Sequence, residues 1–195
     1  MINRNKFFEV IDRDLGTEDR DQIEWAYSLA KYYHLAQVRD SGERYFEHPK
    51  SVALVLIEFP PTSPKEIIMA LLHDLSEDQF VPRGMIRKLF GEDVDEGLKI
   101  LSNKKIIFRT KAQIDKINKS KEEYYAQIME APLSVRRVKL ADRIHNLRTL
   151  GECSPDKIKR KIAETKKFIY PLAEKTDQKF LKIIQKESTD LSPLT

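Results

Sequence analysis

Four side chains of the sequence have the character of metal ligands: His48, His73, Asp74 and Asp142. Two imidazoles and two carboxylates suit Mn²⁺, Fe²⁺, Co²⁺ or Zn²⁺ better than Ca²⁺, whose ligands are oxygens only. His73 and Asp74 are adjacent on a predicted helix, where neighbouring side chains lie about 100° apart, so both can reach an ion between their directions. Four protein ligands on an octahedral ion leave two positions for water and a substrate oxygen, as a hydrolase requires.

A second pair of acids follows one helical turn later. Glu77 is four residues after His73, and Asp78 is four residues after Asp74. We therefore expect these side chains on one side of the helix. An acid in this position can accept a proton from a metal-bound water or orient that water. Acids this close repel one another without a cation, which favours a metal site over the alternative, a helix with unusual salt bridges.

Five further polar side chains are candidates for contacting a ligand beside this centre: Arg39, Ser41, Tyr45, Asn146 and Thr149. Asparagine and threonine can hydrogen-bond a sugar or a phosphate. Arginine can stack on a base or bind phosphate, and tyrosine can stack and donate a hydrogen bond. These side chains suit a ligand that carries phosphate, sugar or base groups.

We interpret the remaining histidines, the cysteine and several aromatic residues as structural. His34 is expected to be packed or at the surface. His145 lies three residues after Asp142, about 60° from its face of the helix, and is not expected to be a ligand. Cys153 fills the end of a helix, since nothing else supports thiol chemistry. The aromatic residues expected in the core are Phe7, Phe8, Trp25, Tyr27 and Tyr33.

The helix that must position His73 has the clearest start signal in the chain. Ser63, Pro64 and Glu66 form a capping box with proline at the first helical position. The apolar run that follows leads directly to the histidine. This pattern predicts a buried helix that delivers its last residues to the candidate centre.

Other punctuation divides the chain into short helices. Helices are predicted to begin at Thr17 and at Ser134, the second carrying Asp142, and Pro171 should bend or break a later helix. The polar and basic residues Ser102–Ser120 are predicted to form a loop. No run shows the sustained alternation of a sheet. We predict an all-α fold in a single domain of eight to ten helices.

Composition limits the class of protein. The 195 residues are 41% hydrophobic and 34% charged, which is typical of a globular chain. The single cysteine excludes an internal disulfide framework and a cysteine-cluster metal site, so a reducing cytoplasm is the expected setting. Apolar runs are too short to cross a bilayer. The first residues lack the apolar segment of a signal peptide.

Positive charge is concentrated in two segments. The net charge of +4 is too small to imply nucleic-acid binding, but Lys104–Lys121 and Lys157–Lys167 are strongly basic. Such runs are usually solvated surfaces. The alternative is a rim that attracts a polyanionic ligand.

The motifs resemble the HD superfamily of metal-dependent phosphohydrolases, and more narrowly the hydrolase domain of the RelA/SpoT alarmone enzymes. The matching stretches are Gln37–Pro49, Ala70–Asp78, Phe90–Gly91 and Lys139–Leu150. The match extends from about Ile23 to Tyr170. It implies one HD-type hydrolase domain over residues 1–195, with C-terminal helices from residue 171, similar to the small stand-alone alarmone hydrolases.

The resemblance also implies an activity. The expected reaction is the Mn²⁺-dependent removal of the 3′-pyrophosphate of ppGpp or pppGpp, which yields GDP or GTP. The implied metal ligands are His48, His73, Asp74 and Asp142. Glu77 and Asp78 would position and activate the attacking water. The implied nucleotide contacts are Arg39, Ser41, Tyr45, Asn146 and Thr149.

Two departures from the family pattern concern the substrate. Asp40 replaces a basic residue, and Arg44 replaces a common proline. A carboxylate near a polyanion weakens binding unless Arg44 restores the charge. This motivates one alternative, an HD phosphohydrolase for another nucleotide or phosphorylated cofactor. A second alternative is a nucleotide-binding module without catalysis, for which the Glu77 position has no use.

Overall fold

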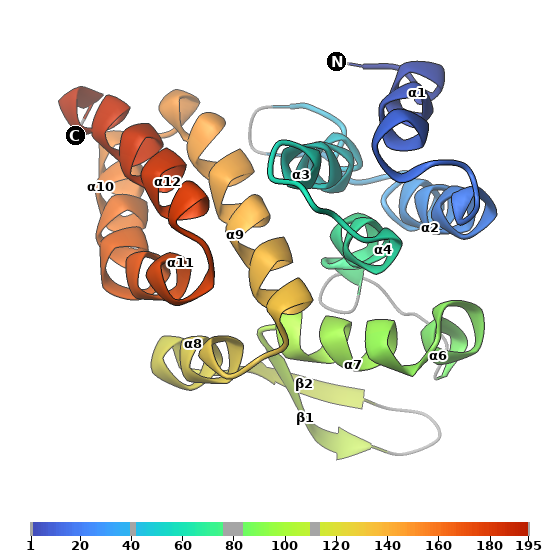
Figure 1. Ribbon diagram of the computed structural model, residues 1–195. Coiled ribbons are helices and arrows are strands. Elements are labelled where there is room, and N and C mark those ends of the chain that lie inside the picture. Colours follow the sequence, from blue (N-terminus) through green and yellow to red (C-terminus); the bar gives the residue numbers. More distant parts are fainter. Residues whose placement is uncertain (1, 40–41, 76–83, 110–113, 195) are drawn as a thin grey trace.

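The computed structural model describes residues 2–39, 42–75, 84–109 and 114–194, and these are mostly helical (Figure 1). The helices of the first half are α1 (Arg4–Leu15), α2 (Arg20–Tyr33), α3 (Glu47–Ile57), α4 (Pro64–Leu72), α6 (Met85–Phe90) and α7 (Glu92–Leu101). Those of the second half are α8 (Lys121–Met129), α9 (Leu133–Arg148), α10 (Pro155–Glu164), α11 (Tyr170–Thr176) and α12 (Gln178–Asp190), with short 3₁₀ turns at Leu150–Glu152 and Ser192–Leu194. The predicted all-α fold class is confirmed.

Helix α9 lies at the centre of the molecule. It packs against α3, α4 and α7 on one side and against α11 and α12 on the other (Figure 1). Because it is covered from several directions, it buries apolar residues such as Leu140 and Ile144 and also charged residues, among them Asp142 and Arg143. A buried charge needs a partner, so α9 is where polar chemistry concentrates.

Helix α4 consists only of apolar residues from Ile67 to Leu72, and all of these are buried. The predicted capping box is present: the Ser63 side chain accepts from the Glu66 backbone N–H, and the Glu66 carboxylate accepts from the Ser63 backbone N–H. Glu66 also accepts from Arg137 Nε at 2.7 Å, which ties the start of α4 to α9. The capped helix therefore has a fixed position from which to present His73.

The expectation of a loop at residues 102–120 is wrong. The chain forms two antiparallel strands, β1 (Lys104–Arg109) and β2 (Ile114–Asn118), whose outer pair is Lys104 with Asn118. Lys104 Nζ also donates to the Asn118 side chain at 2.7 Å. Strand preference depends strongly on context, so a short basic segment gives little signal of a two-stranded ribbon.

The aromatic core is confirmed in part. Phe7, Phe8 and Tyr27 are buried, whereas Tyr33 is half-buried and Trp25 is 66% exposed. Helix α2 packs on α4 and buries the face that carries Tyr27. Trp25 is two residues earlier, about 200° around the helix, and so lies on the opposite face.

Three helix ends differ in detail from the prediction. Helix α9 begins at Leu133, one residue before Ser134, and Pro132 is at its N-cap position. Helix α2 begins at Arg20, so Thr17 is not its cap. The expected interruption near Pro171 takes the form of a π-helical turn, Thr165–Ile169, and the proline lies in the first turn of α11. Proline is tolerated there because the first backbone N–H groups of a helix have no intrahelical partner.

Among the helices of the described residues, none combines the length and apolar character that crossing a bilayer demands.

Candidate metal centre

The consecutive helices α3 and α4 and the distant helix α9 bring the predicted ligands together. His48 lies in the first turn of α3, and Asp142 lies on α9. His73 and Asp74 directly follow α4. One ligand atom from each of His48, His73 and Asp74 can be chosen so that all lie within 4.8 Å of one another.

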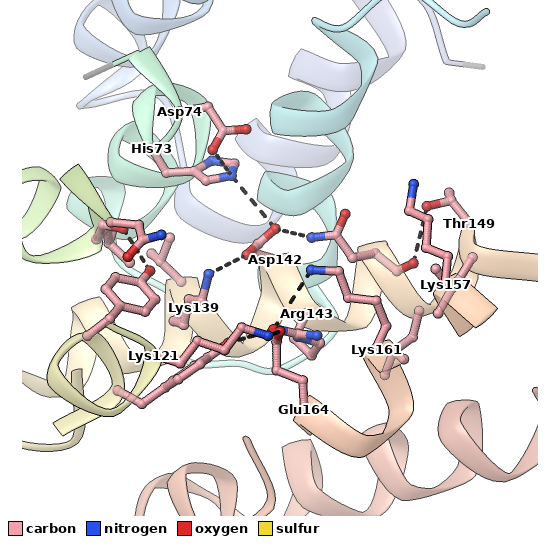
Figure 2. A pocket seen from close by; sticks show the side chains of 18 of the residues that line it. His73, Asp74, Lys121, Lys139, Asp142, Arg143, Thr149, Lys157, Lys161 and Glu164 are labelled. Carbon is pink, nitrogen blue, oxygen red and sulfur yellow. Dashed lines mark hydrogen bonds and ion pairs between the residues drawn. The ribbon is translucent and has the colours of Figure 1, made fainter. Parts of the chain in front are cut away.

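Asp142 faces this group from the opposite wall (Figure 2). Its Oδ1 atom is 3.3 Å from His48 Nε2 and 3.8 Å from His73 Nε2. Asp74 completes the arrangement, with Oδ1 3.3 Å from His73 Nε2 and Oδ2 3.6 Å from His48 Nε2. All four predicted ligands therefore converge on one point.

The state of His73 tests whether a cation fits there. Its Nδ1 atom is 2.8 Å from the carbonyl oxygen of Ala70, which can only accept, so Nδ1 carries the proton. In the neutral imidazole with the proton on Nδ1, the Nε2 atom carries a free lone pair. This atom is buried and has no hydrogen-bond partner among the described residues. A bare nitrogen facing two carboxylates is suited to a divalent ion of the mixed nitrogen and oxygen class.

His145 contributes to the centre in a way that the sequence reasoning missed. Its Nδ1 atom lies 2.8 Å from Nδ1 of His48, and both rings are buried. Burial, then the neighbouring His48 and Arg39, lowers the pKa of His145 to about 3. Burial likewise lowers the pKa of His48, against the opposing effect of Asp142. Both imidazoles are therefore neutral near pH 7, and one nitrogen of the pair must accept.

Asp142 uses its two oxygens differently. Oδ1 faces the histidines, and Oδ2 accepts from Lys139 Nζ at 2.9 Å. Burial raises the pKa of Asp142, but the Lys139 ammonium and the imidazoles outweigh it and hold the pKa well below its usual value. The carboxylate is ionised across the physiological range. Lys139, a second residue not foreseen from the sequence, leaves only one oxygen of Asp142 directed at the centre.

Asp74 is supported by Tyr45. The Tyr45 hydroxyl donates to Asp74 Oδ2 at 2.7 Å. Burial raises the pKa of the Asp74 carboxyl. The opposing effects of His73, His48 and this hydrogen bond outweigh burial, so the pKa lies below its usual value. Tyr45 was predicted to contact a nucleotide, and in the structure its hydroxyl contacts a candidate ligand.

The other predicted binding residues lie beside the centre. Asn146 donates to Asp142 Oδ1 at 2.5 Å and accepts from Arg39 Nη2 at 3.1 Å, in line with the shared helix face expected for Asp142 and Asn146. Arg39 Nη1 is buried and lacks a hydrogen-bond partner among the described residues. Thr149 donates its hydroxyl to the backbone oxygen of His145 at 3.1 Å.

Three predicted site residues, Ser41, Glu77 and Asp78, lie outside the described residues. So does Asp40, one of the two departures from the family pattern.

Two cavities border the centre, and Asp74, Asp142, Asn146 and Thr149 line both. The wider cavity, about 1340 Å³, lies between the loop before α3 and the turn after α9. The narrower one, about 380 Å³, lies between α8, α9 and α10 and is drawn in Figure 2. Arg39 lies at the junction, since it too lines both cavities.

A helical fold built around buried histidine and aspartate residues is typical of HD domains. The chain belongs to the HD domain family, which matches residues 26–178.

Curated relatives match most of this chain. The bifunctional (p)ppGpp synthase/hydrolase SpoT of Escherichia coli K12 is 35% identical over 170 residues, 86% of this chain and 23% of the relative. The guanosine-3′,5′-bis(diphosphate) 3′-pyrophosphohydrolase of Haemophilus influenzae is 34% identical over 84% of this chain and 23% of the relative. A GTP pyrophosphokinase of Brucella melitensis is 33% identical over 89% of this chain, again 23% of the relative. The chain spans about a quarter of these proteins.

A solved structure has a similar fold. It was reported as a metazoan ortholog of SpoT that hydrolyses ppGpp and plays a role in starvation responses. The TM-score is 0.73, with 20% sequence identity, 88% of this chain covered and 96% of that chain covered. At this identity the likeness concerns the fold.

Proposed function

We propose that this chain is a single HD-type hydrolase domain that removes the 3′-pyrophosphate of ppGpp or pppGpp. The observation that carries the proposal is the convergence of His48, His73 and Asp74 on one buried point that Asp142 Oδ1 also faces. The names of the relatives supply the substrate class, since two of them are called (p)ppGpp hydrolases or 3′-pyrophosphohydrolases. The single cysteine agrees with a reducing cytoplasm.

We propose Mn²⁺ as the ion, held by His48, His73, Asp74 and Asp142. When bound, such an ion polarises phosphate oxygens and provides a nucleophile from water at neutral pH. Around it, Tyr45 and Lys139 hold one oxygen of each carboxylate. These contacts orient the donor set before any ligand arrives.

The nucleotide occupies the wider cavity in this proposal. Arg39 is fixed by Asn146 and has a buried Nη1 donor with no partner in the described residues. A phosphate oxygen or a guanine acceptor satisfies such a donor. Thr149 and Tyr45 line this cavity, and Ser41 is expected from the sequence to add a further contact.

Glu77 and Asp78 are proposed to orient the attacking water and take its proton. In the sequence, Glu77 lies four residues after His73 and Asp78 lies four residues after Asp74, a spacing that suits this task. Their carboxylates must act as bases, so activity should fall when either is made neutral.

The decisive experiment combines turnover with metal content. Purified protein with Mn²⁺ should release pyrophosphate from ppGpp, EDTA should stop the release, and Glu77→Gln should lower kcat by at least about 100-fold. Metal content, measured by elemental analysis, should be unchanged in Glu77→Gln because this residue is not among the proposed ligands. Wild-type release no faster than that of Glu77→Gln would reject the proposal.

One observation favours a second candidate, a phosphohydrolase for another nucleotide. Arg44 donates to Glu47 at 3.0 Å, so its charge is partly neutralised and offsets Asp40 poorly. A panel of nucleotides assayed side by side decides between the two. Faster turnover of a nucleotide that lacks a 3′-pyrophosphate would favour the second candidate. Tight binding of ppGpp without any turnover would instead support a non-catalytic module.

A further inference from the structure

The narrower cavity has a markedly cationic wall beside the metal centre (Figure 2). Its basic lining residues are Arg39, Lys121, Lys139, Arg143, Lys157 and Lys161. Its acidic lining residues are Asp74, Asp142 and Glu164. Two of these three acids belong to the proposed donor set, so Glu164 is the acid left to balance the cations of α8, α9 and α10.

Glu164 is already neutralised by other residues. Its Oε1 atom accepts from Arg143 Nη2 at 2.6 Å and from the Tyr125 hydroxyl at 3.1 Å. Its Oε2 atom accepts from Lys121 Nζ. The carboxylate therefore has two cationic partners and a neutral donor before Lys161 is considered.

Lys161 is an additional cation against the same carboxylate. Its Nζ atom is 3.8 Å from Glu164 Oε1, beyond hydrogen-bonding distance, and its side chain is partly buried. Burial lowers the pKa of Lys161, and the nearby positive charges of Arg143 and Lys139 lower it further against the opposing effect of Glu164. Lys139 is itself paired with Asp142. The wall around Lys161 thus carries more positive than negative charge.

We infer that this wall is a subsite for a diphosphate group, with Lys161 as its principal charged contact. The inference rests on the proposed function and names the part of the cavity that receives the leaving pyrophosphate. A phosphate bound at the metal centre would contact Asp74 and Asp142, which line both cavities. The nucleotide fills the wider cavity, and the leaving diphosphate enters the narrower one, where Lys161 binds it. A polyphosphate matches several clustered cations better than a base or a sugar does.

The test measures binding of inorganic pyrophosphate to the full chain by calorimetry, in EDTA so that no metal chelates the ligand. Lys161→Met should weaken this binding about tenfold, the value of one charge-assisted contact. Lys159→Met is the matched control, because Lys159 is exposed on the same helix and does not line the cavity. Equal affinities of wild type and Lys161→Met, or no binding by wild type, would overturn the inference.

A second arm distinguishes the two diphosphates of the reaction. GDP affinity should be the same in wild type and Lys161→Met, because the 5′-diphosphate belongs to the nucleotide in the wider cavity. If Lys161→Met weakens GDP but not pyrophosphate, the assignment to the leaving group is wrong. Lys161→Met should also melt no lower than wild type, since Glu164 keeps its other partners, and Lys161→Arg should restore pyrophosphate binding.

These measurements separate the subsite from the activity. Calorimetry with pyrophosphate needs no turnover, so a Lys161-dependent signal supports the subsite even if ppGpp is not hydrolysed. If ppGpp is hydrolysed and pyrophosphate binding ignores Lys161, the proposed function stands and the subsite is rejected.

Discussion

Each imidazole of the centre uses Nδ1 for a contact outside the donor set and turns Nε2 toward the carboxylates of Asp74 and Asp142. His73 engages the carbonyl of Ala70 through Nδ1, and His48 engages His145 in the same way. If His48 Nε2 holds a cation, that nitrogen has no proton, so Nδ1 is the donor and His145 accepts. Such outer contacts fix the tautomer and the orientation of a ligand.

This gives a prediction for His145. His145→Leu removes the acceptor and should weaken Mn²⁺ or Co²⁺ binding by about 10- to 100-fold. His145→Asn keeps an oxygen able to accept and should recover much of the affinity. Titration of the visible absorption of bound Co²⁺ measures both. If His145→Leu and His145→Asn bind the metal equally well, His145 does not act through its hydrogen bond to His48.

At this scale, helix periodicity predicted contacts within one helix but not contacts between helices. Asn146 lies one turn after Asp142, and the two do hydrogen-bond. His145 points about 60° away from that face, toward α3, where it meets His48. The angle kept it out of the proposed donor set. Only the packing of α3 on α9 shows that it supports a residue of that set.

At the scale of elements, Glu164 joins three helices. It lies on α10 and contacts Arg143 of α9 and Lys121 of α8. Burial raises its pKa, but Arg143 and Lys121 outweigh burial and lower the pKa to about 2. A carboxyl group with a depressed pKa stabilises the fold at neutral pH. Its contribution is lost as the pH falls from about 4.5 to about 2.

Glu164→Gln should therefore lower the free energy of unfolding by about 2 kcal/mol at pH 7, and by much less near pH 2.5. Urea denaturation at the two pH values measures the difference. Glu122→Gln is the control, since its pair with Lys167 is exposed to solvent and exposed pairs contribute little to stability. A deficit of Glu164→Gln that is equal at both pH values would contradict the electrostatic explanation.

The elements differ in how well the sequence alone predicts them. Helix α4 is predicted by its own residues, because Ser63 and Glu66 satisfy each other locally. The ribbon of β1 and β2 has no such signature, since each strand is defined by its pairing with the other. The outward position of Trp25 follows from which face of α2 meets α4, a choice made by packing.

At the scale of the whole molecule, the candidate metal centre joins segments far apart in the chain. About half of the chain separates His48 from Asp142, and α3, α4 and α9 meet there. Any ion that binds the folded chain and not the unfolded one stabilises it by mass action. An ion bound at the centre is therefore expected to stabilise the packing of α3 and α4 against α9.

Removal of the metal should lower the melting temperature. With the ion at about 100 times its dissociation constant, the stabilisation is about 2.7 kcal/mol, or roughly 5–10 °C for a chain of this size. Differential scanning fluorimetry with EDTA, followed by Mn²⁺, measures it. The melting temperature of Asp142→Asn should not change when EDTA or Mn²⁺ is added. A wild-type melting temperature unaffected by EDTA and Mn²⁺ would contradict a metal that links the helices.

The exposure of Trp25 has a practical consequence for spectroscopy. It is the single tryptophan of the chain and is 66% exposed on α2. Its indole is already largely hydrated in the native state, so its emission should shift little to the red on unfolding. The same ring is an intrinsic fluorescent probe of the outer surface of α2. Iodide should quench its fluorescence readily in the folded protein.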